Sequence, residues 1–195
     1  MEVAMDSIFE ERTSILAGAP NGRRTLSRLV ERASPEPVVA EPIFLNFANV
    51  EIATASFLRE AVLVFRDAVR GRRSKFYPVV ANANQQVVDE LIVLLTPNHN
   101  VLMSCDLSSA GVVSKPALIG DLDPKQRLTF NLVNQHGETD ASELMRVYGA
   151  EEDVKQTAWN NRLSSLAGLG LVFEISQGRA KRYRSLFGEV EKYGN

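Results

Sequence analysis

The sequence predicts an α/β sheet-and-helix domain followed by a smaller α+β domain. Three observations lead to this prediction. Apolar runs with strand-like and helix-like spacing alternate between residues 38 and 105, which is typical of βαβ units. The periodicity fades over residues 106–123, where serine, glycine and proline gather. Residues 124–187 then read as three short helices and a two-stranded hairpin.

Composition places the chain among ordinary folded proteins. Of its 195 residues, 24% are charged and 45% are hydrophobic, and the net charge is −2 at pH 7. Affinity for nucleic acid must therefore come from a local patch. The single cysteine, Cys105, excludes an internal disulfide and fits a reducing compartment. No run approaches the roughly 20 apolar residues that span a bilayer. The N-terminus has acids where a signal peptide carries basic residues, so we expect a cytoplasmic protein that binds no membrane.

Residues 1–37 are predicted to form a helical segment. Helices are expected over residues 6–16 and 23–33, and in the second of them Leu26, Leu29 and Val30 form a partial apolar stripe. Residues 18–22 (GAPNG) are dense in helix breakers and predict a turn between the two helices.

The α/β domain is expected over residues 38–105. Its predicted strands are residues 43–47, 76–81 and 100–104, and its predicted helices are residues 57–70 and 85–95. Residues 106–123 are predicted to be a linker, although a strand within residues 111–119 would make that linker shorter.

Three helices open the C-terminal domain, residues 124–187. They are expected over residues 125–136, 140–148 and 156–170. Thr139 or Asp140 would cap the second helix, Gly149 would end it in the left-handed region, and Asp153 would cap the third. The hairpin follows over residues 171–186, and residues 188–195 are a tail.

The third helix divides into an apolar and a polar side. Trp159, Leu163 and Leu166 form a stripe that would pack on the first two helices. The opposite side is polar but nearly uncharged, and Asn and Gln side chains suit bidentate pairing to adenine. Four cations in the hairpin, among them Arg184, would supply salt-dependent contacts to the DNA backbone. The predicted DNA-binding residues are Lys155, Gln156, Thr157, Asn160, Asn161, Arg162, Ser164, Arg179, Lys181 and Arg182.

The order of these elements resembles the helix and wing of bacterial winged-helix regulators. The residues that carry the resemblance are Asn161-Arg162-Leu163 through Leu166 to Gly170-Leu171-Val172, then Gly178-Arg179 and Tyr183. The resemblance implies a winged helix-turn-helix fold that binds DNA. The alternative is a winged helix used only for packing or protein interaction, since the acids at residues 151–153 would repel phosphate.

Residues 43–65 carry a second resemblance. A buried strand, a short loop with Thr and Ser, and an amphipathic helix resemble STAS domains, the fold of anti-sigma-factor antagonists, and look like the STAS-like domain of unknown function of bacterial regulatory proteins. In the antagonists the loop reads Asp-Ser-Ser-Gly, and a partner kinase phosphorylates the second serine. The aligned residues here are Thr54-Ala55-Ser56-Phe57. The resemblance therefore puts Ser56 at the phosphorylated position, with Thr54 in place of Asp and Phe57 in place of Gly.

Ser56 has two interpretations that do not exclude each other. A phosphate there would lie at a helix N-terminus, where the backbone amides and the helix dipole favour an anion. Alternatively, Ser56 or Thr54 is an ordinary N-cap, which strand-to-helix junctions commonly need.

The remaining histidine, cysteine and aspartate residues considered are expected to have structural rather than catalytic roles. His99 and His136 are expected in solvent-facing turns, Cys105 as a small buried hydrophobe, and Asp121 and Asp123 in turn and cap positions. The basic run at residues 70–75 is interpreted as a solvated helix end, with a second phosphate-binding surface as the alternative. We expect no enzyme, no metal site and no cofactor.

Together these features predict a bacterial transcriptional regulator. A STAS-like domain would receive a signal or a protein partner, such as a kinase-like ATPase or an anti-sigma factor. The winged helix would bind double-stranded DNA as a homodimer on a palindromic site. The alternative is a partner-switching adaptor whose winged helix mediates protein interaction rather than DNA binding.

Overall fold

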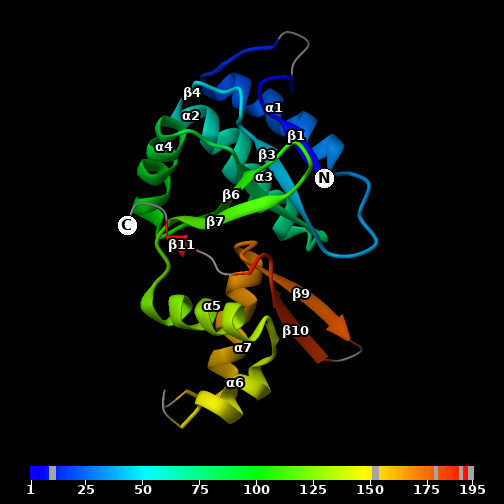
Figure 1. The fold of residues 1–195 in the computed structure, drawn as a ribbon, viewed down its shortest axis with the longest axis vertical. Coiled ribbons are helices and arrows are strands. Elements are labelled where there is room, and N and C mark those ends of the chain that lie inside the picture. The colour runs from blue at the N-terminus through cyan, green and yellow to red at the C-terminus, as the bar shows by residue number, and fades with distance from the viewer. Residues whose placement is uncertain (9–11, 151–153, 178–179, 189–190, 193–195) are drawn as a thin grey trace.

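A six-stranded, mostly parallel sheet separates two groups of helices (Figure 1). The computed structural model describes residues 1–8, 12–150, 154–177, 180–188 and 191–192. The strand order is β1-β3-β5-β6-β7-β11, with β6 and β7 antiparallel and the other neighbours parallel. These strands are β1 (Glu2–Ala4), β3 (Glu41–Asn46), β5 (Phe76–Ala81), β6 (Val101–Leu107), β7 (Val113–Gly120) and β11 (Glu191–Lys192).

Strand β5 shows why both faces of the sheet are covered. Every residue of β5 is buried, as expected for a central parallel strand. Because side chains alternate along a strand, Phe76 and Val80 enter one hydrophobic core while Tyr77 and Val79 enter the other. The sheet is therefore shared by two cores.

Helices from the first half of the chain cover the first face. Two of the predicted helices are confirmed: residues 57–70 fall within a continuous run of helix that includes one π-helical segment, and residues 85–95 form α4. The small strand pair β2 (Ile15–Leu16) and β4 (Ile52–Ala53) lies beside them. The helices are α1 (Ala19–Arg32), α2 (Ala55–Leu58), η1 (Arg59–Leu63), α3 (Val64–Gly71), α4 (Gln85–Leu95) and η2 (Thr96–Asn98).

The helix predicted over residues 6–16 is wrong for the described part of that range. Residues 1–8 contain β1 instead, which pairs with β3, and residues 15–16 form β2. The amide of Thr13 donates to the carbonyl oxygen of Asp6, which closes a loop between the two strands. Pairing with a sheet edge outweighs weak local helix propensity here. Of the predicted helical segment 1–37, only α1 is helical among the described residues. It begins at Ala19, so the turn predicted over residues 18–22 is wrong beyond Gly18: proline is tolerated in the first turn of a helix, where Pro20 lies.

The region predicted as a linker is mostly sheet. Strand β6 extends to Leu107, and residues 113–120 form β7, so the alternative of a strand in this region is confirmed. In the predicted tail, β11 pairs with β7 at Ala117 and Leu118.

Three helices and a three-stranded antiparallel sheet form the last part of the chain. The sheet order is β8-β10-β9. Asp123 and Asp140 cap α5 and α6 through hydrogen bonds from backbone amides, as expected. Gly149 has φ −61°, so the predicted left-handed end of α6 is wrong, and the predicted cap at Asp153 lies outside the described residues. The elements are α5 (Pro124–His136), β8 (Glu138–Thr139), α6 (Ala141–Tyr148), α7 (Gln156–Gly168), β9 (Val172–Gln177) and β10 (Ala180–Ser185).

The second hydrophobic core joins these C-terminal elements to the sheet. It contains Met103 and Leu118 from the sheet together with Phe130, Trp159 and Val172 from the helices and β9. Burial of this shared apolar surface holds α5, α7 and β9 against the second face of the sheet. The fold observed is therefore mixed α/β with a parallel-rich sheet and helices on both faces.

Candidate nucleic-acid interface

Helix α7 presents the polar face that the sequence predicts. Trp159, Leu163 and Leu166 are fully buried, which confirms the apolar stripe. The opposite side chains are exposed along the whole helix: Gln156, Thr157, Asn160, Asn161 and Ser164.

Two residues of α7 are held by other helices: Gln156 at the start of this polar face, and Ser165, next to Ser164 near its end. The side-chain nitrogen of Gln156 donates to the hydroxyl of Ser142 on α6 at 2.6 Å. That of Gln126 on α5 donates to Ser165 at 2.9 Å. These contacts fix α7 relative to its neighbours and leave Asn160 and Asn161 as the exposed amides at its centre.

Lys155 and Arg162, expected beside the polar face, differ in their accessibility. Lys155 is exposed at the N-cap position of α7. Arg162 is half-buried, and its guanidinium carbon lies 5.1 Å from the centre of the Trp159 ring. Arg162 thus packs on the helix bundle, while Lys155 is open to a phosphate group.

Two of the hairpin cations, Lys181 and Arg182, are engaged by carboxylates within the fold. Lys181 forms a 2.8 Å ion pair with Glu174 on the neighbouring strand. Arg182 contacts three carboxylates, with Nε 2.5 Å from Glu138, Nη1 3.1 Å from Asp140 and Nη2 3.7 Å from Glu143. The hydrogen bond to Glu138 is the main cause that raises the pKa of Arg182.

These partners could not be foreseen from local sequence, because β10 meets β8 and α6 only in the folded chain. Arg179 and the acids at residues 151–153 lie outside the described residues.

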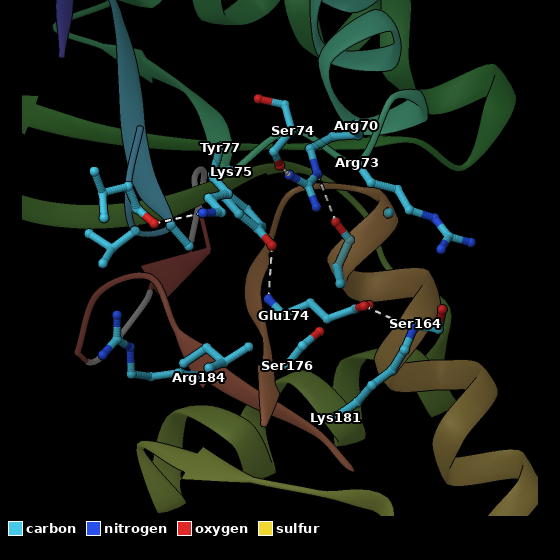
Figure 2. Close-up of a pocket in the computed structure, with 16 residues that line it drawn as sticks. Arg70, Arg73, Ser74, Lys75, Tyr77, Ser164, Glu174, Ser176, Lys181 and Arg184 are labelled. Atoms are coloured by element: carbon cyan, nitrogen blue, oxygen red, sulfur yellow. Dashed lines mark hydrogen bonds and ion pairs between the residues drawn. The ribbon is translucent and has the colours of Figure 1, made fainter. Parts of the chain in front are cut away.

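A basic pocket lies between the sheet and the C-terminal elements (Figure 2). It has a volume of about 710 Å³. One wall comes from the end of α3, the turn after it and residues 38–40; the other comes from α7, β9 and β10. Five cations line it, namely Arg70, Arg73, Lys75, Lys181 and Arg184.

The sequence predicts only parts of this pocket. It favours a solvated helix end for the basic run at residues 70–75, with a phosphate-binding surface as the alternative, and it places Ser164 and Lys181 among the DNA-binding residues. The structure brings all three onto one cavity. The run ends α3 at Gly71, yet Arg70 is half-buried rather than solvated. No signal in the sequence relates residues 70–75 to residues 164–184, since tertiary packing alone brings them together.

At the far end of the sheet, Thr54 rather than Ser56 is the N-cap. Thr54 Oγ1 accepts the amides of Gly18 at 3.1 Å and Phe57 at 3.4 Å. Ser56 is half-buried beside it, with its Oγ 3.2 Å from that of Thr54. The carboxylate of Glu90 accepts the amide of Ala55 at 3.1 Å. This negative charge already occupies the helix start, so it would oppose a phosphate on Ser56.

The remaining chemistry-bearing residues occupy structural positions. Cys105 is buried, and desolvation raises the pKa of its thiol to about 12. His99 and His136 are exposed, and the Nε2 of His136 lies 2.9 Å from the hydroxyl of Tyr148. Within the described residues, no three His, Cys, Asp or Glu side chains cluster as metal ligands would. Nor does any helix of that part of the chain combine the length and hydropathy that a membrane span requires.

Comparison with known proteins gave no relative: no family model matches the chain, and no curated protein matches it significantly.

Proposed function

We propose that this chain is a bacterial DNA-binding transcriptional regulator whose C-terminal elements form a winged helix. The observation that carries the proposal is the element order α5-β8-α6-α7-β9-β10 with sheet order β8-β10-β9. In that arrangement α7 takes the place of the recognition helix, and the β9–β10 hairpin takes the place of the wing.

The exposed face of α7 supports base reading over nonspecific attraction. Asn160 and Asn161 are exposed amides at its centre, and each amide can pair with adenine N6 and N7. With Lys181 and Arg182 engaged by carboxylates, nonspecific attraction to DNA depends on few cations. DNA would therefore be bound mainly where the major groove matches α7.

The first half of the chain would be the receiving domain. Its sheet and helices α1–α4 are proposed as STAS-like, with a protein partner that contacts the Thr54–Ser56 end of the sheet. Homodimer formation would place two copies of α7 on a palindromic site, one helical turn of DNA apart.

The test is selection of duplexes from a random DNA library at low salt, followed by fluorescence anisotropy on the enriched sequence. Replacing both Asn160 and Asn161 by Ala is expected to weaken specific binding about tenfold or more, because each bidentate contact contributes roughly 1–3 kcal/mol. Gln86→Ala is the matched control, since Gln86 is an exposed amide on α4, across the sheet. No enrichment, with no DNA retention at low salt, would rule out the regulator.

One observation favours a second function, a partner-switching adaptor. The internal ion pairs of Lys181 and Arg182 leave the hairpin poorer in available positive charge than a DNA-binding wing usually is. If the library selection fails, this function predicts that the same α7 face binds a protein. In that case Asn160→Ala and Asn161→Ala would weaken capture of one defined partner, such as a kinase-like ATPase.

A further inference from the structure

The side chains that line the basic pocket between the sheet and α7 include more cations than carboxylates. Its lining holds five Lys or Arg side chains and one carboxylate, Glu174, which is paired with Lys181. Four positive charges therefore remain in excess. Among the described residues, none of those four forms an ion pair with a carboxylate.

The side-chain hydrogen bonds and ring contacts of these cations are with neutral groups. The nearby carboxylate of Glu36 also attracts Lys75, but it accepts from the Lys75 backbone amide and forms its ion pair with Arg72, outside the lining. Lys75 Nζ donates to the carbonyl oxygen of Val38 at 2.6 Å. Arg70 donates to three backbone carbonyls, and its guanidinium lies 3.7 Å from the centre of the Tyr77 ring. The guanidinium of Arg184 lies 5.3 Å from the Phe173 ring. Carbonyls and rings orient a cation without neutralising it, and Glu36 is shared between Arg72 and Lys75, so the pocket keeps an excess of positive charge.

An apolar wall adjoins the charged one. Val38 is 89% exposed and Val39 67% exposed, and both line the pocket with half-buried Ile175. Lys75 lies against this wall, because its Nζ donates to the carbonyl oxygen of Val38, and Arg184 lines the same cavity. A ligand with an apolar part and an anionic group could bury the valines and form charge-assisted hydrogen bonds with Lys75 and Arg184 at the same time.

We propose that this pocket binds a small phosphorylated molecule of about nucleotide size. The volume of about 710 Å³ falls within the range of small-molecule sites, about 300–1,000 Å³. DNA also carries phosphate, but the DNA backbone would leave the apolar wall uncovered. The pocket lies at the amino ends of β3 and β5, beside Ala40 and Lys75, rather than at their carboxyl ends, where α/β sheets usually hold ligands.

Such a ligand would touch both halves of the protein. Arg73 and Lys75 belong to the sheet side, whereas Ser164 and Gly168 belong to α7. A phosphate bridging them would strengthen the contact between α7 and the sheet, and would thereby tie the position of α7 to the ligand.

The test is isothermal titration of the full chain, without DNA, with inorganic pyrophosphate, ATP and adenosine. We expect both phosphorylated probes to bind, adenosine to bind far more weakly, and ATP to exceed pyrophosphate because its base and ribose reach the valines. Lys75→Gln and Arg184→Gln should each raise the dissociation constant about tenfold, the effect of losing a hydrogen bond to a charged group.

Arg32→Gln is the control, because Arg32 is an exposed cation on α1 outside the pocket. Circular dichroism of each variant excludes loss of fold as the cause. The proposal is overturned if pyrophosphate and ATP fail to bind at millimolar concentration, or if the control weakens binding as much as the pocket variants.

A competition experiment with duplex DNA distinguishes a small phosphorylated ligand from the phosphate groups of the DNA backbone. If pyrophosphate displaces DNA and both pocket variants weaken DNA binding by the same factor, the anion is backbone phosphate and the small-ligand site is wrong. Since the titrations contain no DNA, their result does not depend on whether the chain binds DNA.

Discussion

Arg70 on α3 donates its Nε hydrogen to the carbonyl oxygen of Ala167 on α7, 97 residues later in the chain, at 3.1 Å. The same guanidinium donates to the carbonyl oxygens of Ser74 and Phe76 and stacks over Tyr77. The hydroxyl of Tyr77 accepts the amide of Glu174 on β9 at 2.8 Å. These bonds join α3, the sheet and the hairpin at one point and place a positive charge at the C-terminal end of α7, where the helix dipole favours it.

Arg70→Met is therefore expected to destabilise the protein. Methionine keeps most of the aliphatic stem but leaves three carbonyl oxygens without their charged donor, at a cost of roughly 2 kcal/mol. For a chain of this length that lowers Tm by about 4–8 °C in a calorimetric scan. Arg32→Met is the matched control and should leave Tm nearly unchanged. An unchanged Tm for Arg70→Met would mean that α7 docks through the apolar core alone.

Arg182→Gln is expected to act on stability as well as on any DNA affinity. Arg182 bridges Glu138, Asp140 and Glu143, so its loss leaves three carboxylates close together, one of them the N-cap of α6. The side chain is 30% exposed, so solvent moderates the loss to roughly 1–2 kcal/mol. Urea titration measures this loss, with Arg146→Gln on the exposed side of α6 as control. If stability is unchanged but DNA affinity falls, Arg182 contacts DNA and the ion pairs open on binding.

Gly22→Ala should weaken the contact between α1 and the helix that follows β4. A Cβ on Gly22 would lie 2.8 Å from the carbonyl oxygen of Phe57 and 2.8 Å from the Cβ of Glu60. Both are closer than real contacts, so the helices must separate, at a cost of about 1–3 kcal/mol. Gly71→Ala is the control, because an added Cβ there meets no atom within 4 Å apart from the neighbouring residues and backbone of its own helix. Chemical denaturation compares the two variants, and equal midpoints would show that the helix pair adjusts without cost.

Alkaline pH is expected to destabilise the fold through Cys105 and Tyr183. Desolvation raises the pKa of each group to about 12 in the folded protein, from 9.0 for the thiol and 10.0 for the phenol. Between the unfolded and folded values the unfolded chain has lost the proton that the folded chain keeps, so stability falls as pH rises. The thiol contribution is complete below about pH 9 and is lost between about pH 9 and 12.

Cys105→Ala removes the thiol contribution, so its stability curve should be flatter above pH 9 than that of the parent protein. A thiol reagent at pH 8 should label native Cys105 slowly and the denatured chain fast, because only the thiolate reacts. Rapid labelling of the native protein would show that Cys105 is accessible.

Local patterns were enough to locate most helices. The helical spacing of residues 57–70 and 85–95, the acids Asp123 and Asp140 before α5 and α6, and the stripe Trp159-Leu163-Leu166 all report short-range physics, and the structure confirms them. Where local sequence signals were weak, pairing with strands of the sheet determined the secondary structure. Residues 2–4 and 113–120 form strands because their backbones pair with β3 and β6 respectively.

The candidate sites divide in the same way. The sequence by itself determined which side chains of α7 face outward, because helical periodicity fixes the two sides. It could not determine that Arg182 is held by three carboxylates, that Thr54 caps while Ser56 does not, or that residues 70–75 meet β9 and β10 around one cavity. Those outcomes depend on how the two faces of one sheet bring distant residues together, and only burial of the shared core decides that packing.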